Sequence, residues 1–140
     1  MGFDPKNKSA KIFDSGNAPY SVSNLPFVGK SIAAILKQPE RTSNQYLSVA
    51  SFTITQNEVL EMLEEETGTK FQITNIKTSD LEKMGDEKFA KGDGGAFYQY
   101  ALQWIFGDSN NHAVKDDATR LLGLEGDDLR ATIKKVLGEL

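Results

Sequence analysis

Residues 55–76 read TQNEVLEMLEEETGTKFQITNI, and this stretch predicts a helix followed directly by a strand. Thr55 and Glu58 have the spacing of a capping box, in which each side chain satisfies one free backbone N–H at the helix start. Gly68 is expected to close the helix, because glycine readily takes the left-handed conformation found there. From Phe71 to Ile76 apolar and polar residues alternate, as in a half-buried strand. A helix followed by a strand favours a mixed α/β fold.

The predicted helix has an apolar face and an acidic face. The residues expected to point inward are Val59, Leu60, Met62 and Leu63. The residues expected to point into solvent are Glu61, Glu64, Glu65 and Glu66. An acidic run of this kind on the outer face of a helix is most simply a solvated surface.

The residues before this stretch continue the alternation of strands and helices. Alternating residues predict strands at 9–13 and 44–50. Between them Ser23 or Asn24 is suited to cap a helix, Pro26 fits its first turn, and Pro39 ends it. The apolar residues that share one face of this helix are Val28, Ile32, Ile35 and Leu36.

The residues after the stretch predict helices only. Ser79 and Glu82 form a second capping-box pattern, which opens a helix reaching about Lys91. Glycines at 92–95 break it, and further helices are expected over 97–106 and 116–122. Asp127 is expected to cap the last helix. Its expected inward residues are Leu129, Ile133, Val136 and Leu137. Residues 1–56 are therefore interpreted as the end of an α/β sheet, and residues 57–140 as a mainly helical cap with one short strand.

Composition excludes several classes of protein. The chain has 140 residues, no cysteine and a formal net charge of −4. It therefore lacks a disulfide scaffold and a thiol nucleophile, and it is a poor match for nucleic-acid backbones. The longest apolar stretch, residues 31–36, is far short of the about 20 residues that span a membrane, and the first residues lack the apolar core of a signal peptide. We expect a cytoplasmic protein with neither membrane nor nucleic acid as a partner.

The phosphate-binding and catalytic motifs that the sequence could contain are incomplete. Gly92 and Gly94 begin a dinucleotide fingerprint, but Phe97 occupies the third glycine position and no apolar strand precedes. Gly29 begins a Gly-Lys-Ser tripeptide without the upstream glycine of a phosphate-binding loop. No tyrosine is followed four residues later by lysine. No catalytic and no cofactor-binding residue is therefore assigned.

One histidine and no cysteine predict no metal site. His112 could be oriented by Asp116, four residues on, but a loop or helix-start contact is the simpler interpretation.

The aromatic segment at 97–106 allows two interpretations. At helical spacing one face combines Phe97, Ala101, Trp104 and Ile105, and this face is predicted to join the core. The alternative is a pocket wall, because ligand sites are lined mainly by apolar and aromatic groups with few polar ones. The polar groups of that pocket would be Tyr98, Tyr100 and Gln103.

Three stretches, taken in order, resemble one known family. The first joins Gly16-Asn17 to residues 23–36, SNLPFVGKSIAAIL; the second runs from Gln38 through residues 44–49; the third combines residues 55–60 and 66–71. Together they are similar to the C-terminal half of NmrA-like, isoflavone-reductase-like proteins, which are atypical short-chain dehydrogenase/reductases found widely in fungi. The resemblance extends from about Lys8 to the end of the chain.

This resemblance implies the closing elements of a Rossmann-like, NAD(P)-binding fold followed by a mainly helical lid on the substrate side. In a complete relative, NADP(H) would bind mainly to an N-terminal half that this chain lacks, and a small, aromatic substrate would lie under the lid. Phe27 stands where the family usually has Asp. The isolated chain is therefore expected to bind no cofactor and to be inactive by itself.

Two functional classes stay open at this point. One is the substrate-binding part of an oxidoreductase, and the other is a non-enzymatic NmrA-type module for regulation or protein interaction. If the chain is the part of a larger fold that the resemblance implies, it is expected to bind a hydrophobic dye or to self-associate, because a partial sheet exposes an edge and an apolar face.

Overall fold

The computed structural model describes residues 2–115 and 117–140. These residues form two compact units that interleave along the chain. Unit 1 comprises Met1–Tyr20, Thr55–His112 and Leu140, and unit 2 comprises Ser21–Ile54 and Ala113–Glu139. Helices and small sheets combine in the chain, as the predicted α/β class requires. The boundary placed between residues 56 and 57 stays a prediction.

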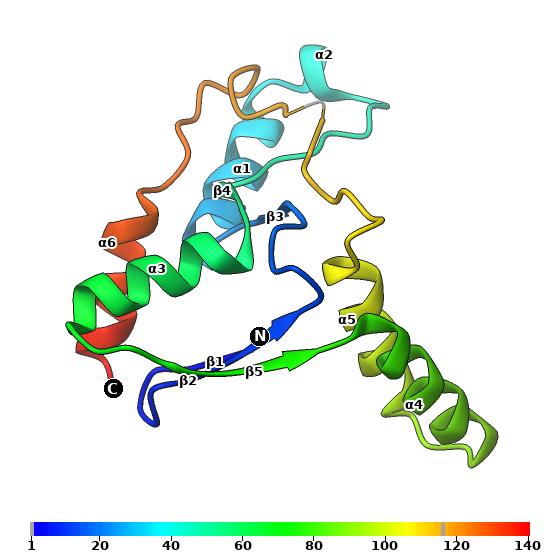
Figure 1. Ribbon diagram of the computed structural model, residues 1–140. Coiled ribbons are helices and arrows are strands. Elements are labelled where there is room, and N and C mark those ends of the chain that lie inside the picture. The colour runs from blue at the N-terminus through cyan, green and yellow to red at the C-terminus, as the bar shows by residue number, and fades with distance from the viewer. Residues whose placement is uncertain (1, 116) are drawn as a thin grey trace. The chain divides into compact units, whose positions relative to one another are not determined.

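A three-stranded sheet forms the centre of unit 1 (Figure 1). Its order is β1 (Phe3–Asp4), β2 (Ser9–Phe13) and β5 (Gln72–Ile76). β1 runs antiparallel to β2, whereas β5 runs parallel to it from the Ser9–Gln72 pair to the Phe13–Ile76 pair. The strands predicted at 9–13 and 71–76 are confirmed. Because β2 and β5 are parallel, their carboxyl ends meet at the same edge of the sheet.

Helix α3 (Gln56–Thr67) begins and ends as predicted. Thr55 Oγ1 accepts from Glu58 N at 3.2 Å, and Glu58 Oε2 accepts from Thr55 N at 2.7 Å, so the capping box is formed. Gly68 closes the helix at φ 61°. The side chain of Gln56 is 1% exposed and bonds to the backbone of β2, accepting from Phe13 N at 3.0 Å. This amide fixes the first turn of α3 to the central strand.

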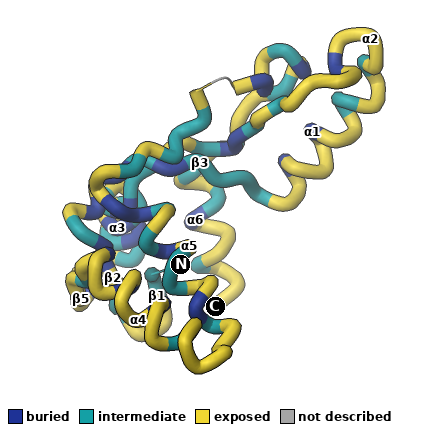
Figure 2. The backbone as a smooth tube through the Cα atoms, turned by 90° about the vertical axis from the view of Figure 1, so that its right-hand side faces the viewer, coloured by how far each residue is buried: buried dark blue, intermediate teal, exposed yellow. Residues whose placement is uncertain are grey.

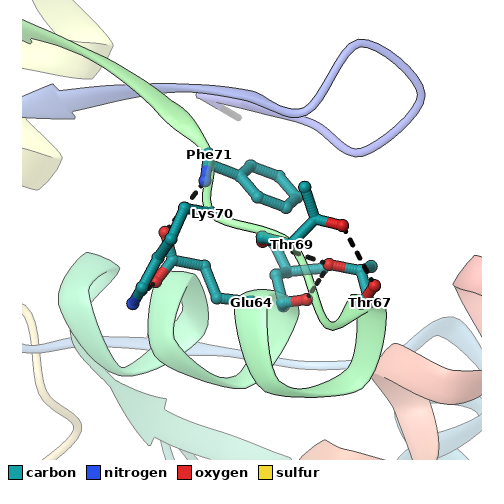
Figure 3. Close-up of polar contacts among 6 residues, drawn as sticks. Glu64, Thr67, Thr69, Lys70 and Phe71 are labelled. Carbon is teal, nitrogen blue, oxygen red and sulfur yellow. Dashed lines mark hydrogen bonds and ion pairs between the residues drawn. The ribbon is translucent and has the colours of Figure 1, made fainter.

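The acidic face of α3 is not uniformly solvated. Glu64 turns back over the helix end, where it pairs with Lys70 and accepts from Phe71 N at 2.9 Å (Figure 3). The hydrogen bonds from Lys70 and from Phe71 lower the pKa of Glu64. In the same turn Thr67 Oγ1 donates to Leu63 O at 2.7 Å. The outward assignment of Glu64 was therefore wrong, because its carboxylate holds the connection between α3 and β5.

Helix α4 (Thr78–Ala90) starts without the predicted capping box at Ser79. Thr78 N and Thr78 Oγ1 instead donate to the carboxylate of Asp14, at 2.8 and 2.6 Å. Asp14 follows β2 directly, so the cap comes from a residue that is close only in the folded chain. A local pattern cannot reveal such a partner.

Helix α5 (Ala96–Phe106) forms where expected but buries a different face. Its buried residues are Ala96, Leu102 and Phe106, while Phe97 is 67% and Trp104 60% exposed. The predicted core face is therefore wrong. A Cβ at Gly85 of α4 would lie 2.5 Å from the ring of Tyr100, so the two helices meet closely at this point. This contact sets the rotation of α5.

Unit 2 contains a two-stranded sheet of β3 (Tyr20–Val22) and β4 (Phe52–Ile54). Its helices are α1 (Leu25–Lys37), α2 (Pro39–Thr42) and α6 (Leu129–Gly138). The strand predicted at 44–50 is wrong, since these residues are irregular and only Ser48 makes a bridge, to Asp117. Alternation alone does not make a strand when no partner strand lies beside it.

Two further helix predictions in unit 2 are corrected. Residues 118–123 form turns rather than a helix, and residue 116 lies outside the described residues. The N-cap of α6 is Asp128, whose Oδ1 accepts from Ala131 N at 2.9 Å. Asp127 instead accepts from Asn24 Nδ2 and Ser51 Oγ, both at 2.9 Å. Its carboxylate joins the start of α1 to the start of α6.

Candidate functional site

Unit 1 contains a cavity of about 940 Å³ between the sheet and the helical pair α4–α5. Strands β1, β2 and β5 supply one part of the lining, and the first turns of α4 and α5 supply the other. The lining includes the charged, apolar and aromatic side chains of Lys11, Phe13, Lys77, Leu81, Met84 and Tyr98.

The cavity runs along one face of β2 from Ser9 and reaches the carboxyl ends of the parallel strands β2 and β5. Phe13 and Ile76, which end these strands opposite each other, both line it. A second cavity of about 550 Å³, lined by residues that include Asp14 and Lys77, lies at the same edge. In open α/β sheets ligands bind at the carboxyl ends of the strands. One end of the cavity therefore lies at the edge of the sheet where ligands bind in open α/β folds.

The alternation of β2 sorts its residues between two faces. Ser9, Lys11 and Phe13 line the cavity, while Ala10 and Ile12 are buried on the other face. Figure 1 shows α3 running along the sheet. The face that α3 leaves open is thus the one that carries the cavity.

The walls of the cavity combine a buried apolar base with an exposed rim. Phe13, Leu81 and Leu102 are at most 5% exposed and form the base. Met84 and Tyr98 on the rim are 46% and 56% exposed. An apolar base bordered by many polar and charged side chains can hold a small molecule that has both an apolar and a polar part.

Charged side chains of both signs border the cavity. Lys11 and Lys77 bring positive charge, and Asp4 and Asp80 bring negative charge. Asp4 accepts from Asn7 Nδ2 at 2.7 Å and from Asn7 N at 3.1 Å, and these bonds lower the pKa of its carboxyl group. Asp4 is therefore held in the turn between β1 and β2.

The structure separates the three residues that the sequence assigned to a pocket. Tyr98 lines the cavity. Tyr100 donates its hydroxyl to Asp86 at 2.7 Å and lies against Gly85, within the packing of α4 on α5. That hydrogen bond raises the pKa of Tyr100. Gln103 is half-buried and is not among the residues that line the cavity.

Sequence reasoning missed Lys11, Met84 and Gln99, which also line the cavity. The alternation of Ser9, Lys11 and Phe13 placed Lys11 on the same face as Phe13, so that signal was present for β2. Nothing local indicated that the same face would meet α4 and α5.

A hydrogen-bond network joins the carboxyl end of β2 to both helices of the pair. Asp14 accepts from Thr78 at the start of α4 and, at 3.3 Å, from Asp108 N beyond the end of α5. Asp108 in turn accepts from Ser15 Oγ at 2.6 Å. Burial alone would raise the pKa of Asp14, but the bonds from Thr78 and Asp108 outweigh it and hold this pKa below its ordinary value. The network fixes the helical wall of the cavity to the sheet.

The described residues do not fit the pyrophosphate of a dinucleotide. Such a site needs a glycine turn and a helix N-terminus with free N–H groups. Carboxylates already accept N–H groups at four described helix starts: Glu58 at α3, Asp14 at α4, Asp93 at α5 and Asp128 at α6. Each would repel a phosphate. The connection from β3 to α1 contains no glycine before Gly29.

His112 packs against the indole of Trp104, with ring centroids 3.7 Å apart. Its Nε2 is buried and has no hydrogen-bond partner among the described residues. The predicted pairing partner, Asp116, lies outside those residues. In the described part of the chain no group of three or more His, Asp or Glu side chains could hold a metal ion, and no helix there is long and apolar enough to cross a membrane.

Comparisons with known proteins give relatives that are longer than this chain. No family model matches. Oxidoreductase poxI of Penicillium oxalicum is 28% identical over 98% of this chain and 45% of its own length. Oxidoreductase aprR of Aspergillus flavus is 30% identical over 66% of this chain and 31% of its own length. The chain therefore spans less than half the length of these curated relatives.

The fold has a counterpart among solved structures. A nucleoside-diphosphate-sugar epimerase from Staphylococcus aureus matches 89% of this chain and 43% of its own, with a TM-score of 0.64 and 14% identity. At that identity the likeness concerns the fold alone. The chain thus has the α/β fold of part of a sugar epimerase and is similar in sequence to two fungal oxidoreductases.

Proposed function

We propose that this chain forms the substrate-side part of an NAD(P)-dependent oxidoreductase-like protein, and that the cavity in unit 1 receives the substrate. The observation that carries the proposal is the cavity at the carboxyl ends of β2 and β5, closed on one side by α4 and α5. The similarity to oxidoreductases of fungi supports it, as does the resemblance to NmrA-like proteins.

The lining suggests what the cavity contributes to binding. Phe13, Leu81 and Leu102 exclude water from the base, which strengthens polar contacts made inside. Tyr98 at the rim offers both an aromatic face and a hydroxyl, so it can stack on a ring and orient a polar substituent. Its neighbour in the lining, Gln99, offers an amide that donates and accepts. We propose a small, aromatic substrate on these grounds.

The cofactor belongs to a different part of the protein in this proposal. Carboxylates already bond to the starts of α3, α4, α5 and α6, and no glycine turn precedes α1. These observations support a proposal in which NADP(H) binds to the portion of the fold that the relatives have and this chain does not span. The chain then presents substrate to a nicotinamide held elsewhere.

The proposal predicts binding of small aromatic carbonyl compounds and alcohols in the cavity. Saturation-transfer NMR on the isolated chain should detect members of such a panel. Tyr98→Ala should lower the affinity for these compounds by about tenfold, the effect of losing one well-placed aromatic contact. Tyr46→Ala is the matched control, since Tyr46 is fully exposed in unit 2.

Two outcomes would contradict this proposal. One is that no compound binds, and the other is that Tyr98→Ala and Tyr46→Ala have equal effects. If compounds bind but a chimera with the rest of a relative never reduces or oxidises them, the regulatory alternative is favoured instead.

A further inference from the structure

Helix α1 of unit 2 has a buried side and, separately, an exposed apolar side. One side carries Phe27 and Ser31, which are 1% and 2% exposed. The other side carries Leu25, Val28, Ile32 and Leu36, called the α1 stripe below, which are 85%, 37%, 55% and 74% exposed. In Figure 2 most of α1 has the colour of exposed residues, with only short buried segments.

An exposed apolar stripe beside an already buried side is typical of a surface that another body of protein covers. The stripe follows the spacing i, i+3, i+7 and i+11, which lines residues up along a helix. At its start Leu25 also lines a groove of about 480 Å³ shared with Ala131 and Val136 of α6. The groove continues the apolar surface only through Leu25, Ala131 and Val136, because its lining also includes Asp127, Asp128 and Glu139.

The remaining side of α1 is basic. Lys30 and Lys37 are exposed there, and no acidic residue occurs from Leu25 to Lys37. A surface that fits this helix is therefore apolar at its centre and acidic at its edge.

We propose that the α1 stripe docks the part of the fold that the relatives possess beyond the region matched by this chain. This inference rests on the proposed function, in which that part holds the cofactor. The oxidoreductase of Penicillium oxalicum extends over more than twice the length this chain matches, so relatives have a second body of protein large enough to cover α1.

A second copy of this chain is a poorer occupant of the stripe. α1 has 13 residues, so the stripe is about 20 Å long and about 10 Å wide, a footprint of roughly 200 Å². Stable interfaces bury roughly 800 Å² on each partner. The stripe alone is therefore too small for a stable dimer, but its area fits one segment of a larger interface within a single chain.

The absence of cysteine makes the proposal directly testable by thiol labelling. Ile32→Cys places a single thiol on the stripe, and Lys30→Cys places one on the basic side of the same helix as the control. Each variant is labelled with a maleimide as the isolated chain and as a chimera in which the chain replaces the matched region of the Penicillium oxalicum protein. Peptide mass spectrometry then reports each site separately.

We expect Ile32→Cys to react freely in the isolated chain and at least about tenfold more slowly in the chimera, because a covered thiol waits for local opening. Lys30→Cys should react equally in both. Equal reactivity of Ile32→Cys in both proteins overturns the proposal. Protection in an isolated monomer would mean that the chain covers its own stripe, and protection in an isolated dimer would mean that a second copy does; both overturn it.

A second measurement applies even where the chimera does not fold. The isolated chain should bind a hydrophobic dye and raise its fluorescence. A double variant that combines Ile32→Glu and Leu36→Glu should lose most of this fluorescence. The matched control, Lys30→Gln with Lys37→Gln, makes the same change in net charge and should leave it intact. Absence of dye binding, or equal loss in both variants, contradicts a docking face. NADPH binding by the chimera is a separate readout, so loss of the proposed function alone would leave protection of Ile32→Cys unchanged.

Discussion

Phe106→Ala should destabilise the protein by about 3–5 kcal/mol, the cost of truncating a large buried aromatic. Phe106 is 2% exposed at the end of α5. Its ring stacks on Phe13 and meets Tyr20 edge-on, with centroids 5.1 Å apart in both pairs. Because Phe13 ends β2 and lines the cavity, this cluster holds α5 against the sheet.

Trp104→Ala is the contrasting variant on the same helix. Trp104 is 60% exposed and contacts the His112 ring, so its loss should cost at most about 1 kcal/mol, since exposed positions lose far less than buried ones. Denaturant unfolding of both variants measures the difference, and Phe106→Leu provides an intermediate case that should retain the fold. A greater loss at Trp104 than at Phe106 would contradict the assignment of the buried face of α5.

Asp14→Ala should destabilise the protein by about 2 kcal/mol, because it removes the cap of α4 and leaves backbone donors of Thr78 and Asp108 without their partner. The backbone of Asp14 is left-handed at φ 49°, a conformation that Ala tolerates poorly. Asp14→Asn keeps an acceptor oxygen and tolerates this φ, so it should cost about half as much. Equal stability of Asp14→Ala and wild type would contradict the network.

The same network predicts how stability depends on pH. The folded-state pKa of Asp14 is lowered from 3.8, so its contribution is complete above about pH 5 and is lost as the pH falls through the lowered value. The loss of stability between pH 7 and pH 3 should therefore be smaller in Asp14→Asn than in wild type. Urea titrations at both pH values test this, and a larger loss in the variant would refute it.

Local signals in the sequence predicted local structure well. The capping box of Thr55 and Glu58 formed because donor and acceptor lie three residues apart, and Gly68 closed the same helix. The capping box expected at Ser79 does not form, because α4 begins at Thr78 and the carboxylate of Asp14 accepts the hydrogen bonds at its start. A capping partner that lies 64 residues away in the sequence cannot be recognised from a pattern of four consecutive residues.

Periodicity showed which residues share a face but not which face is packed. In α1 the face predicted from the sequence was Val28, Ile32, Ile35 and Leu36, but Val28, Ile32 and Leu36 are exposed. The residues that the helix buries are Phe27 and Ser31. In α5 the close contact of Gly85 with Tyr100 set the rotation. The same limit applies to the cavity. The sequence singled out Tyr98 of α5, but most of the other lining residues belong to β1, β2, β5 and α4, and no local pattern shows that these elements meet.

The central claim is that the chain carries the substrate side of the proposed protein and no dinucleotide site of its own. Calorimetric titration of NADPH into the isolated chain at physiological salt tests this most directly. The carboxylates at the starts of α3, α4, α5 and α6 predict no saturable heat. A saturable isotherm at micromolar concentration or tighter would contradict the account, because the cofactor site would then lie within these residues.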